Sequence, residues 1–150
     1  MNKNEVKDKI SIFVKKASLE CDKVAYPLLV DYKLTMVQYK SLKYLYINPP
    51  ATVCHRDIEK FFSMTNPTVT GVLKNLERDG WVERLRNPHD ARSKQLLQLT
   101  DKSLRVKQEL FCIGNEIENT FTAELTAEER EQLLQLLKRL VQSFSQSSAS

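Results

Sequence analysis

Apolar residues recur every three or four positions near both ends of the chain, which is the period of one face of an α-helix. The stripe near the N-terminus consists of Val6, Ile10, Phe13 and Ala17. The stripes near the C-terminus consist of Leu110, Ile113, Gly114, Ile117 and Phe121, and of Leu133, Leu137, Leu140 and Phe144. Because amphipathic helices gain most of their stability by burying the apolar face, these stripes need partners. We favour packing between two copies of the chain; an intramolecular three-helix cluster is the alternative.

Local capping signals set the starts of several helices. Thr35 with Gln38, and Thr126 with Glu129, have the spacing of capping boxes, in which each side chain bonds the other residue's backbone N–H. Thr100 is a further N-cap candidate. The helix that begins after Thr35 is expected to end before the two prolines at 49–50.

The middle of the chain, CHRDIEKFFSMTNPTVTGVLKNLERD at 54–79, divides into two short helices around a tight turn at 63–64. Thr65 is expected to cap the second helix, with Pro67 tolerated in its first turn. The apolar face of this helix consists of Val69, Val72, Leu73 and Leu76. Gly80 is placed to end it. The pattern is typical of a helix-turn-helix.

The opposite face of the second helix is polar and carries no acid before Glu77. Its side chains are Asn66, Pro67, Thr68, Thr70 and Lys74. Hydroxyls, amides and a lysine are groups that meet phosphates and base edges in the major groove of DNA. The alternative is a solvated face on a helix that serves only the core.

Residues 81–100, WVERLRNPHDARSKQLLQLT, alternate as strands do at both ends, and nine residues, 87–95, separate the strands. Hairpin loops usually have about two to five residues. This segment would form a wing beside the second helix. We expect Arg92 to enter the minor groove, Arg84, Arg86 and Lys94 to neutralise phosphates, and Asp90 to orient an arginine or cap the loop. A charged hairpin without a ligand is the alternative.

Bulk properties exclude several classes of protein. The 150 residues, 41% apolar and 28% charged, suit one globular unit, and the net charge of +4 is too small to define a partner. There is no apolar run of membrane-spanning length and no signal-peptide core, so we expect a cytoplasmic protein. Three widely spaced cysteines favour reduced thiols, and no catalytic triad, metal-ligand spacing or cofactor motif indicates an enzyme.

The motifs occur in an order that resembles the MarR family of bacterial winged helix-turn-helix regulators. They are LTMVQ at 34–38, NPTVT at 66–70, LERDGWVER at 76–84 and DARSKQLLQLT at 90–100. The last contains an Asp and an Arg separated by one residue and followed by a Leu-Thr pair, as in that family's wing signature. The similarity covers about residues 5–144.

The resemblance implies a mainly α fold with a small β-hairpin wing. Residues 35–100 would form the winged helix-turn-helix region, and residues 1–34 and 101–144 the helical dimerisation region. Residues 145–150 are expected to form a disordered tail.

The resemblance also implies function: a homodimer that binds a pseudo-palindromic operator in double-stranded DNA and represses transcription in response to a ligand. The polar face of the second helix would contact the major groove and Arg92 the minor groove. Two positions depart from the pattern. Gly71 stands where many relatives carry a long polar or basic side chain, and Cys54 stands where a Ser or Thr cap is usual.

Family members commonly respond to small aromatic ligands bound near the dimer helices. The tyrosines near that junction, expected mostly in the core or interface, are Tyr26, Tyr32, Tyr39, Tyr44 and Tyr46. One alternative is oxidant sensing through Cys21, which has Lys15, Lys16 and Lys23 nearby in the sequence. A second alternative is a helical dimerisation or adaptor protein with a vestigial wing.

Overall fold

The computed structural model describes residues 7–86 and 95–148. The order of elements is α2 (Ile10–Leu29), η1 (Val30–Tyr32), α3 (Met36–Ile47), β1 (Val53–Cys54), α4 (His55–Phe62), α5 (Asn66–Arg78), β2 (Val82–Leu85), β3 (Leu96–Leu99), α6 (Asp101–Arg105), α7 (Lys107–Phe121) and α8 (Ala127–Ser148). The fold is mainly helical with a small antiparallel sheet, as predicted.

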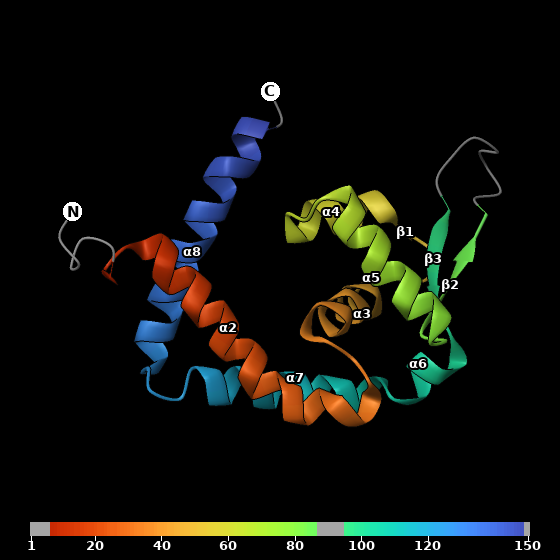
Figure 1. Ribbon diagram of the computed structural model, residues 1–150, viewed down its shortest axis with the longest axis horizontal. Coiled ribbons are helices and arrows are strands. Elements are labelled where there is room, and N and C mark those ends of the chain that lie inside the picture. Colours follow the sequence, from red (N-terminus) through yellow and green to blue (C-terminus); the bar gives the residue numbers. More distant parts are fainter. Residues whose placement is uncertain (1–6, 87–94, 149–150) are drawn as a thin grey trace.

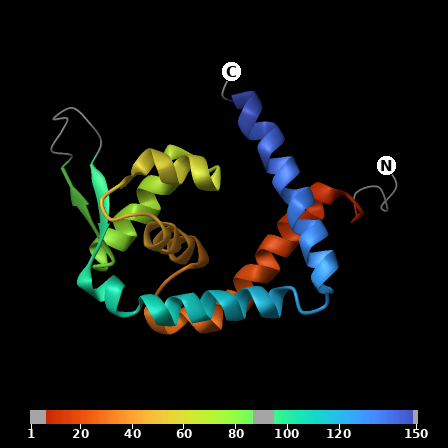
Figure 2. The same cartoon turned by 180° about the vertical axis from the view of Figure 1, so that it is seen from behind.

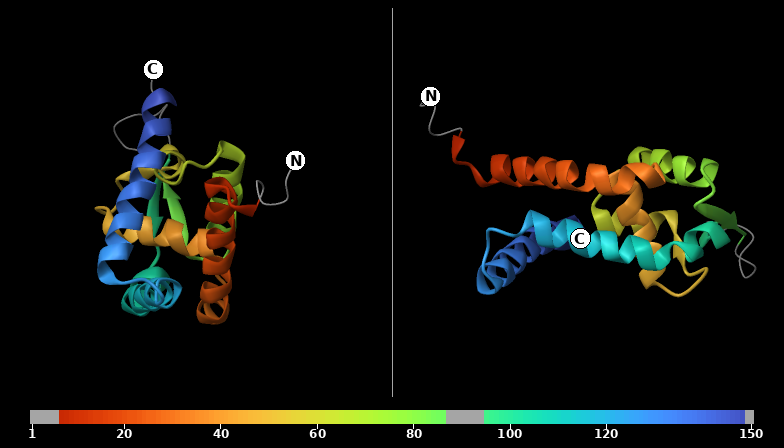
Figure 3. Two further views of the ribbon diagram at one scale, coloured as in Figure 1. Left: turned by 90° about the vertical axis from the view of Figure 1, so that its left-hand side faces the viewer. Right: turned by 90° about the horizontal axis from the view of Figure 1, so that it is seen from below.

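The elements divide the molecule into a lobe and an arm (Figure 1). The lobe consists of α3, α4, α5 and the sheet. The arm consists of α2, α7 and α8. Helix α2 runs beside α7, and α8 rises from the far end of α7 (Figure 2). Seen from below, the molecule is elongated, with α2 along one side and α7 with α8 along the other (Figure 3).

One apolar core joins the lobe to the arm. Leu42 of α3, Ile58 of α4 and Leu73 of α5 are fully buried where the three helices meet. The core continues through Leu29 of α2 and Leu110 of α7, which are each 1% exposed. The position of α5 is therefore fixed through α3 relative to the arm.

Both predicted capping boxes are confirmed. The Gln38 N–H donates to Thr35 Oγ1 at 3.2 Å, and the Thr35 N–H donates to Gln38 Oε1 at 2.9 Å. Thr126 and Glu129 form the same pair of bonds, at 2.9 and 3.2 Å. Gly80 ends α5 as predicted, with φ of 79°.

Three helix boundaries differ from the prediction. α2 continues past Ala17, the last residue of the predicted stripe, to Leu29 with Pro27 inside it, because Ala25 and Leu29 bury one side against the core. The helix expected to run on from Thr100 breaks at Val106 into α6 and α7. α8 runs to Ser148, so residues 145–148 are helical rather than part of the predicted disordered tail; no Gly or Pro interrupts them.

The predicted hairpin is present, and a third strand joins it. The strand order is β1-β3-β2, with all pairs antiparallel. Leu97 of the central β3 pairs with Val53 on one side and Arg84 on the other. The two-residue β1 was not predicted. It leads directly into α4 and thereby fixes the start of the helix-turn-helix to the first half of β3.

Candidate nucleic-acid interface

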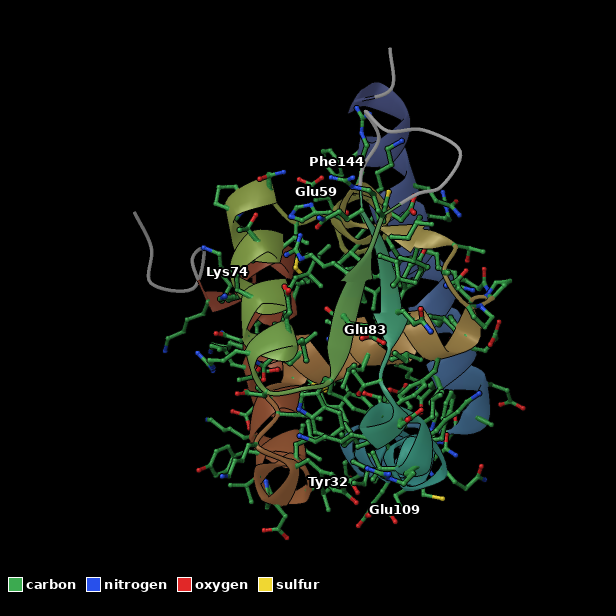
Figure 4. All side chains as sticks on the ribbon, turned by 90° about the vertical axis from the view of Figure 1, so that its right-hand side faces the viewer. Tyr32, Glu59, Lys74, Glu83, Glu109 and Phe144 are labelled. Carbon is green, nitrogen blue, oxygen red and sulfur yellow. The ribbon has the colours of Figure 1, made fainter. Side chains whose placement is uncertain are left out.

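The structure brings the predicted recognition residues together on the outer face of α5. Asn66, Pro67, Thr68, Gly71 and Lys74 are exposed, and Thr70 is half-buried. The other side of the helix is buried through Val69, Leu73 and Leu76, each 0% exposed. Figure 4 shows Lys74 on α5. The face is therefore open to a ligand as large as duplex DNA.

The start of α5 differs in one detail from the prediction. Thr65 occupies the N-cap with φ −75° and ψ 156°, but its side chain does not cap the backbone. Its hydroxyl instead pairs with the Thr68 hydroxyl at 2.9 Å, because Thr68 offers a polar partner one turn away. The first N–H groups of α5 are thus left without a side-chain cap from Thr65, and such groups favour phosphate.

Thr70 is connected to α4 through a residue that the sequence did not single out. The Thr70 hydroxyl lies 2.9 Å from the backbone oxygen of Asn66 and 3.1 Å from Nε2 of His55. The His55 Nδ1 lies 3.5 Å from Glu59 Oε2. No sequence signal could have found this contact, because it joins residues 15 positions apart on two different helices.

The start of α4 uses a carboxylate where its cap residue is weak. Cys54 is the N-cap, and the Cys54 N–H donates to Asp57 Oδ2 at 2.9 Å. An acid in the first turn also suits the helix dipole. Asp57 thus supplies the carboxylate half of a capping box, although the N-cap side chain is a thiol.

The wing residues have different surroundings. Arg86 is exposed at the end of β2. Arg84 instead donates from Nε to Glu77 Oε2 at 2.9 Å, with 27% of its side chain exposed. Only the remaining guanidinium nitrogens of Arg84 are left for a phosphate. The other predicted wing residues, Asp90, Arg92 and Lys94, lie outside the described residues.

A hollow of about 500 Å³ lies between α4, the start of α5 and the sheet. Its lining consists of His55, Arg56, Glu59, Asn66, Arg84, Gln95 and Leu97. The lining contains two guanidinium groups and one imidazole but only one carboxylate. The hollow is therefore a polar recess beside the recognition face, with a surplus of basic groups.

The base of the wing is fastened to the end of α5. The Gly80 N–H donates to Glu77 O and the Trp81 N–H to Leu76 O, which together form a Schellman motif. The Thr100 hydroxyl donates to Gly80 O, and Lys102 Nζ donates to Asp79 O at 2.8 Å. Strand β2 therefore begins, and strand β3 ends, beside the same anchored turn.

The tyrosines at the lobe–arm junction serve mainly the core, as expected. Tyr39 and Tyr46 are 3% and 8% exposed, and their hydroxyls donate to the backbone oxygens of Leu110 and Ser103. Tyr26 is an exception, being 69% exposed.

Cys21 has the environment of an unreactive thiol. Burial raises its pKa above the ordinary value, and the nearby Lys40 only partly opposes that effect. A raised pKa lowers the fraction of thiolate, which is the form that oxidants attack. This finding weighs against oxidant sensing through Cys21.

Two features are absent from the described part of the chain. None of its helices is both long and apolar enough to cross a bilayer. No three His, Cys, Asp or Glu side chains within it are arranged to bind a metal ion.

The arm presents large apolar side chains to solvent. Leu133, Leu137 and Leu140 of α8 are 45%, 36% and 45% exposed, and Ile10 and Phe13 of α2 are 73% and 53% exposed. These five residues of the predicted stripes are therefore exposed within one chain. Contiguous apolar surface of this kind usually marks an interface.

The chain is similar to known regulators and to DNA complexes. The MarR family profile matches residues 34–94. The HTH-type transcriptional regulator BilQ of Clostridioides difficile is 31% identical over 123 residues, which cover 82% of this chain and 78% of BilQ.

Two solved structures show the same architecture. The Staphylococcus aureus MepR–DNA complex matches with a TM-score of 0.80 at 28% identity, covering 91% of this chain and 99% of MepR. A mutant Escherichia coli MarR complexed with operator DNA matches with a TM-score of 0.79 at 27% identity, covering 91% and 96% of the two chains. The chain therefore belongs to the MarR family, whose members are transcriptional regulators rather than enzymes.

Proposed function

We propose that the protein is a homodimeric repressor that binds a pseudo-palindromic operator in double-stranded DNA and responds to a small ligand. The observation that carries the proposal is the exposed face of α5 with Asn66, Pro67, Thr68 and Lys74, whose helix is fully buried on its other side. This face carries no acid before Glu77 and lies beside a hairpin with Arg84 and Arg86, which suits an anionic ligand. A dimer seated on an operator would block transcription by occupying the duplex.

We assign the DNA contacts in two groups. Asn66, Pro67, Thr68, Thr70 and Lys74 would contact the major groove, with Thr65 at the helix start. In the wing, Arg92 would enter the minor groove, Arg86 and Lys94 would neutralise phosphates, and Asp90 would orient a basic side chain. Arg84 would take part only through the nitrogens that Glu77 does not bind.

The arm supports the homodimer. Its uncovered stripes lie on α2 and α8, which belong to the segments 1–34 and 101–144, and self-association would bury them. The operator would then be read by two copies of α5, one in each half-site. Such a regulator acts on the chromosome, so we place it in the bacterial cytoplasm.

The small ligand that we propose is an aromatic effector. A hollow of about 180 Å³ at the end of α3 is lined by Tyr46, Pro49, Val53, Leu99 and Lys107 among others, and it would accept one aromatic ring with an acidic group. An effector shifts DNA binding only if it binds the competent and incompetent forms unequally. Unchanged operator affinity across a screen of aromatic acids would refute the proposed aromatic effector.

The deciding experiment is fluorescence anisotropy with labelled duplex from the gene's own upstream region and with unrelated duplex, over a salt series. The variants are Lys74→Ala, Arg92→Ala and, as a matched control, Lys23→Ala, which changes an exposed lysine of α2. We expect selective binding with a steep negative salt slope, weakened by the first two changes and not by the third.

Equal and weak binding of both duplexes by all variants would refute the proposal in favour of an adaptor protein with a vestigial wing. A fall in reporter output when the gene is deleted would show that the protein is an activator rather than a repressor. Sedimentation of the protein with Leu137→Lys tests the dimer, because a buried charge in the interface should produce monomer; an unchanged dimer would exclude that surface.

A further inference from the structure

The imidazole of His55 lies between the two helices of the helix-turn-helix. Its Nε2 is 3.1 Å from the Thr70 hydroxyl on α5, and its Nδ1 is 3.5 Å from Glu59 Oε2 on α4. The His55 and Glu59 side chains are only 20% and 21% exposed. Thr70 belongs to the face that we propose meets DNA, so His55 links an inner carboxylate to an outer contact residue.

The number of hydrogens available makes this link sensitive to protonation. The Thr70 hydroxyl has one hydrogen and lies near three acceptors: the Asn66 backbone oxygen at 2.9 Å, Asn66 Oδ1 at 3.4 Å and the ring nitrogen of His55. When the ring is neutral with its hydrogen on Nδ1, Nδ1 donates to Glu59 and Nε2 accepts from Thr70. When the ring gains a proton, Nε2–H donates to the Thr70 oxygen, and the hydroxyl hydrogen turns to Asn66 O. Protonation therefore reverses the direction of the Thr70 hydroxyl.

We propose that His55 is a positioning residue for Thr70, and that protonation of its ring strengthens DNA binding. The inference rests on the proposed function. Protonation places a positive charge behind the recognition face and makes the Thr70 oxygen an acceptor from Nε2–H. The charge favours the DNA-bound form, since a polyanion attracts it.

The charged groups around the ring act in both directions. Glu59 favours the protonated ring through its contact with Nδ1. Arg56 and Arg84, which line the same hollow, oppose a further positive charge, although Glu77 offsets the charge of Arg84 at 2.9 Å. Asp57 of α4 is already bonded to the Cys54 N–H. A DNA phosphate in front of the hollow would add to the effect of Glu59 and so couple binding to proton uptake.

The test measures DNA affinity by anisotropy at about pH 8 and about pH 6, a range in which imidazoles commonly change charge. The chain has two histidines, so His89→Gln is the matched control for His55→Gln. We expect wild type and His89→Gln to bind their own upstream duplex about three- to tenfold more tightly at the lower pH, the size of coupling seen between contacting residues. His55→Gln should lose that gain. The double variant His55→Gln/Thr70→Val should bind DNA at least as tightly as whichever single variant binds it less tightly.

The outcomes separate this inference from the proposed function. Selective DNA binding with the same pH dependence in wild type and His55→Gln, or strictly additive effects of the His55 and Thr70 changes, would overturn the inference and leave the repressor intact. Absence of selective binding at both pH values would overturn both. A readout without DNA is the nitrogen NMR spectrum of the rings, assigned with His89→Gln. A neutral His55 ring with its hydrogen on Nε2 would refute the proposed reversal.

Discussion

Replacing Gly114 with alanine is expected to disrupt the packing of α7 against α3. A Cβ at this position would lie 2.0 Å from the Tyr39 hydroxyl oxygen and 3.3 Å from the ring carbon that bears it. Tyr39 is 3% exposed, and its hydroxyl donates to Leu110 O at 3.0 Å. The tyrosine must therefore move, and its hydroxyl must leave its acceptor.

Three contributions set the size of the effect. A buried hydroxyl without a partner costs about 1–3 kcal/mol, and overpacking of a core costs a similar amount. Alanine is favoured over glycine in a helix interior by about 1 kcal/mol, which opposes both. The free energy of unfolding should therefore fall by about 1–5 kcal/mol.

Urea unfolding at one fixed protein concentration measures this change, since association would otherwise alter the apparent stability. Tyr39→Phe is the companion variant, because it removes the oxygen that the new Cβ would meet. We expect Gly114→Ala to cost much less in the Tyr39→Phe background than in wild type. An equal cost in both backgrounds would show that the hydroxyl contact is not the cause.

Three other perturbations test separate features. Gly80→Ala should lower the free energy of unfolding by about 1–2 kcal/mol in urea titrations, because φ is 79° at this position. Gly71→Ala should raise the free energy of unfolding by about 1 kcal/mol, because a Cβ there would meet nothing within 4 Å. Burial raises the pKa of Tyr46 to about 12. The stability that comes from keeping this hydroxyl neutral is therefore complete below about pH 10 and is lost as the pH rises toward 12. The loss of stability at alkaline pH, followed by circular dichroism, should be smaller in Tyr46→Phe. Peroxide treatment should leave DNA affinity unchanged in wild type and in Cys21→Ser alike, since the Cys21 thiol has a raised pKa; a loss confined to wild type would restore oxidant sensing.

Features determined by neighbours in the sequence were predictable. The two capping boxes join residues three positions apart, and the glycine at the end of α5 satisfies a backbone requirement that few other residues meet. The buried face of α5 follows from its apolar period in the same way. The exposed polar face of α5 could therefore be assigned before its surroundings were known.

Features determined by tertiary contacts were not predictable. The two residues of β1 are too few to show an alternating pattern, and they become a strand only because β3 offers backbone partners at Leu96 and Leu97. The pairing of Arg84 with Glu77 and the contact of His55 with Thr70 depend on how separate elements pack. Thr65 was assigned to the correct position with the wrong partner, because its hydroxyl had two choices within one turn.

The anchored turn at the base of the wing also bears on how this protein can change during evolution. The Thr100 hydroxyl at one end of the hairpin donates to the backbone oxygens of Gly80 and Trp81 at the other, and Lys102 Nζ donates to Asp79 O, so the ends are held together. The entropy of closing a loop grows only slowly with its length. Insertions, deletions and substitutions in the connecting segment should therefore cost the fold little, and under the proposed function a preference for new DNA sequences could arise there without change to the core.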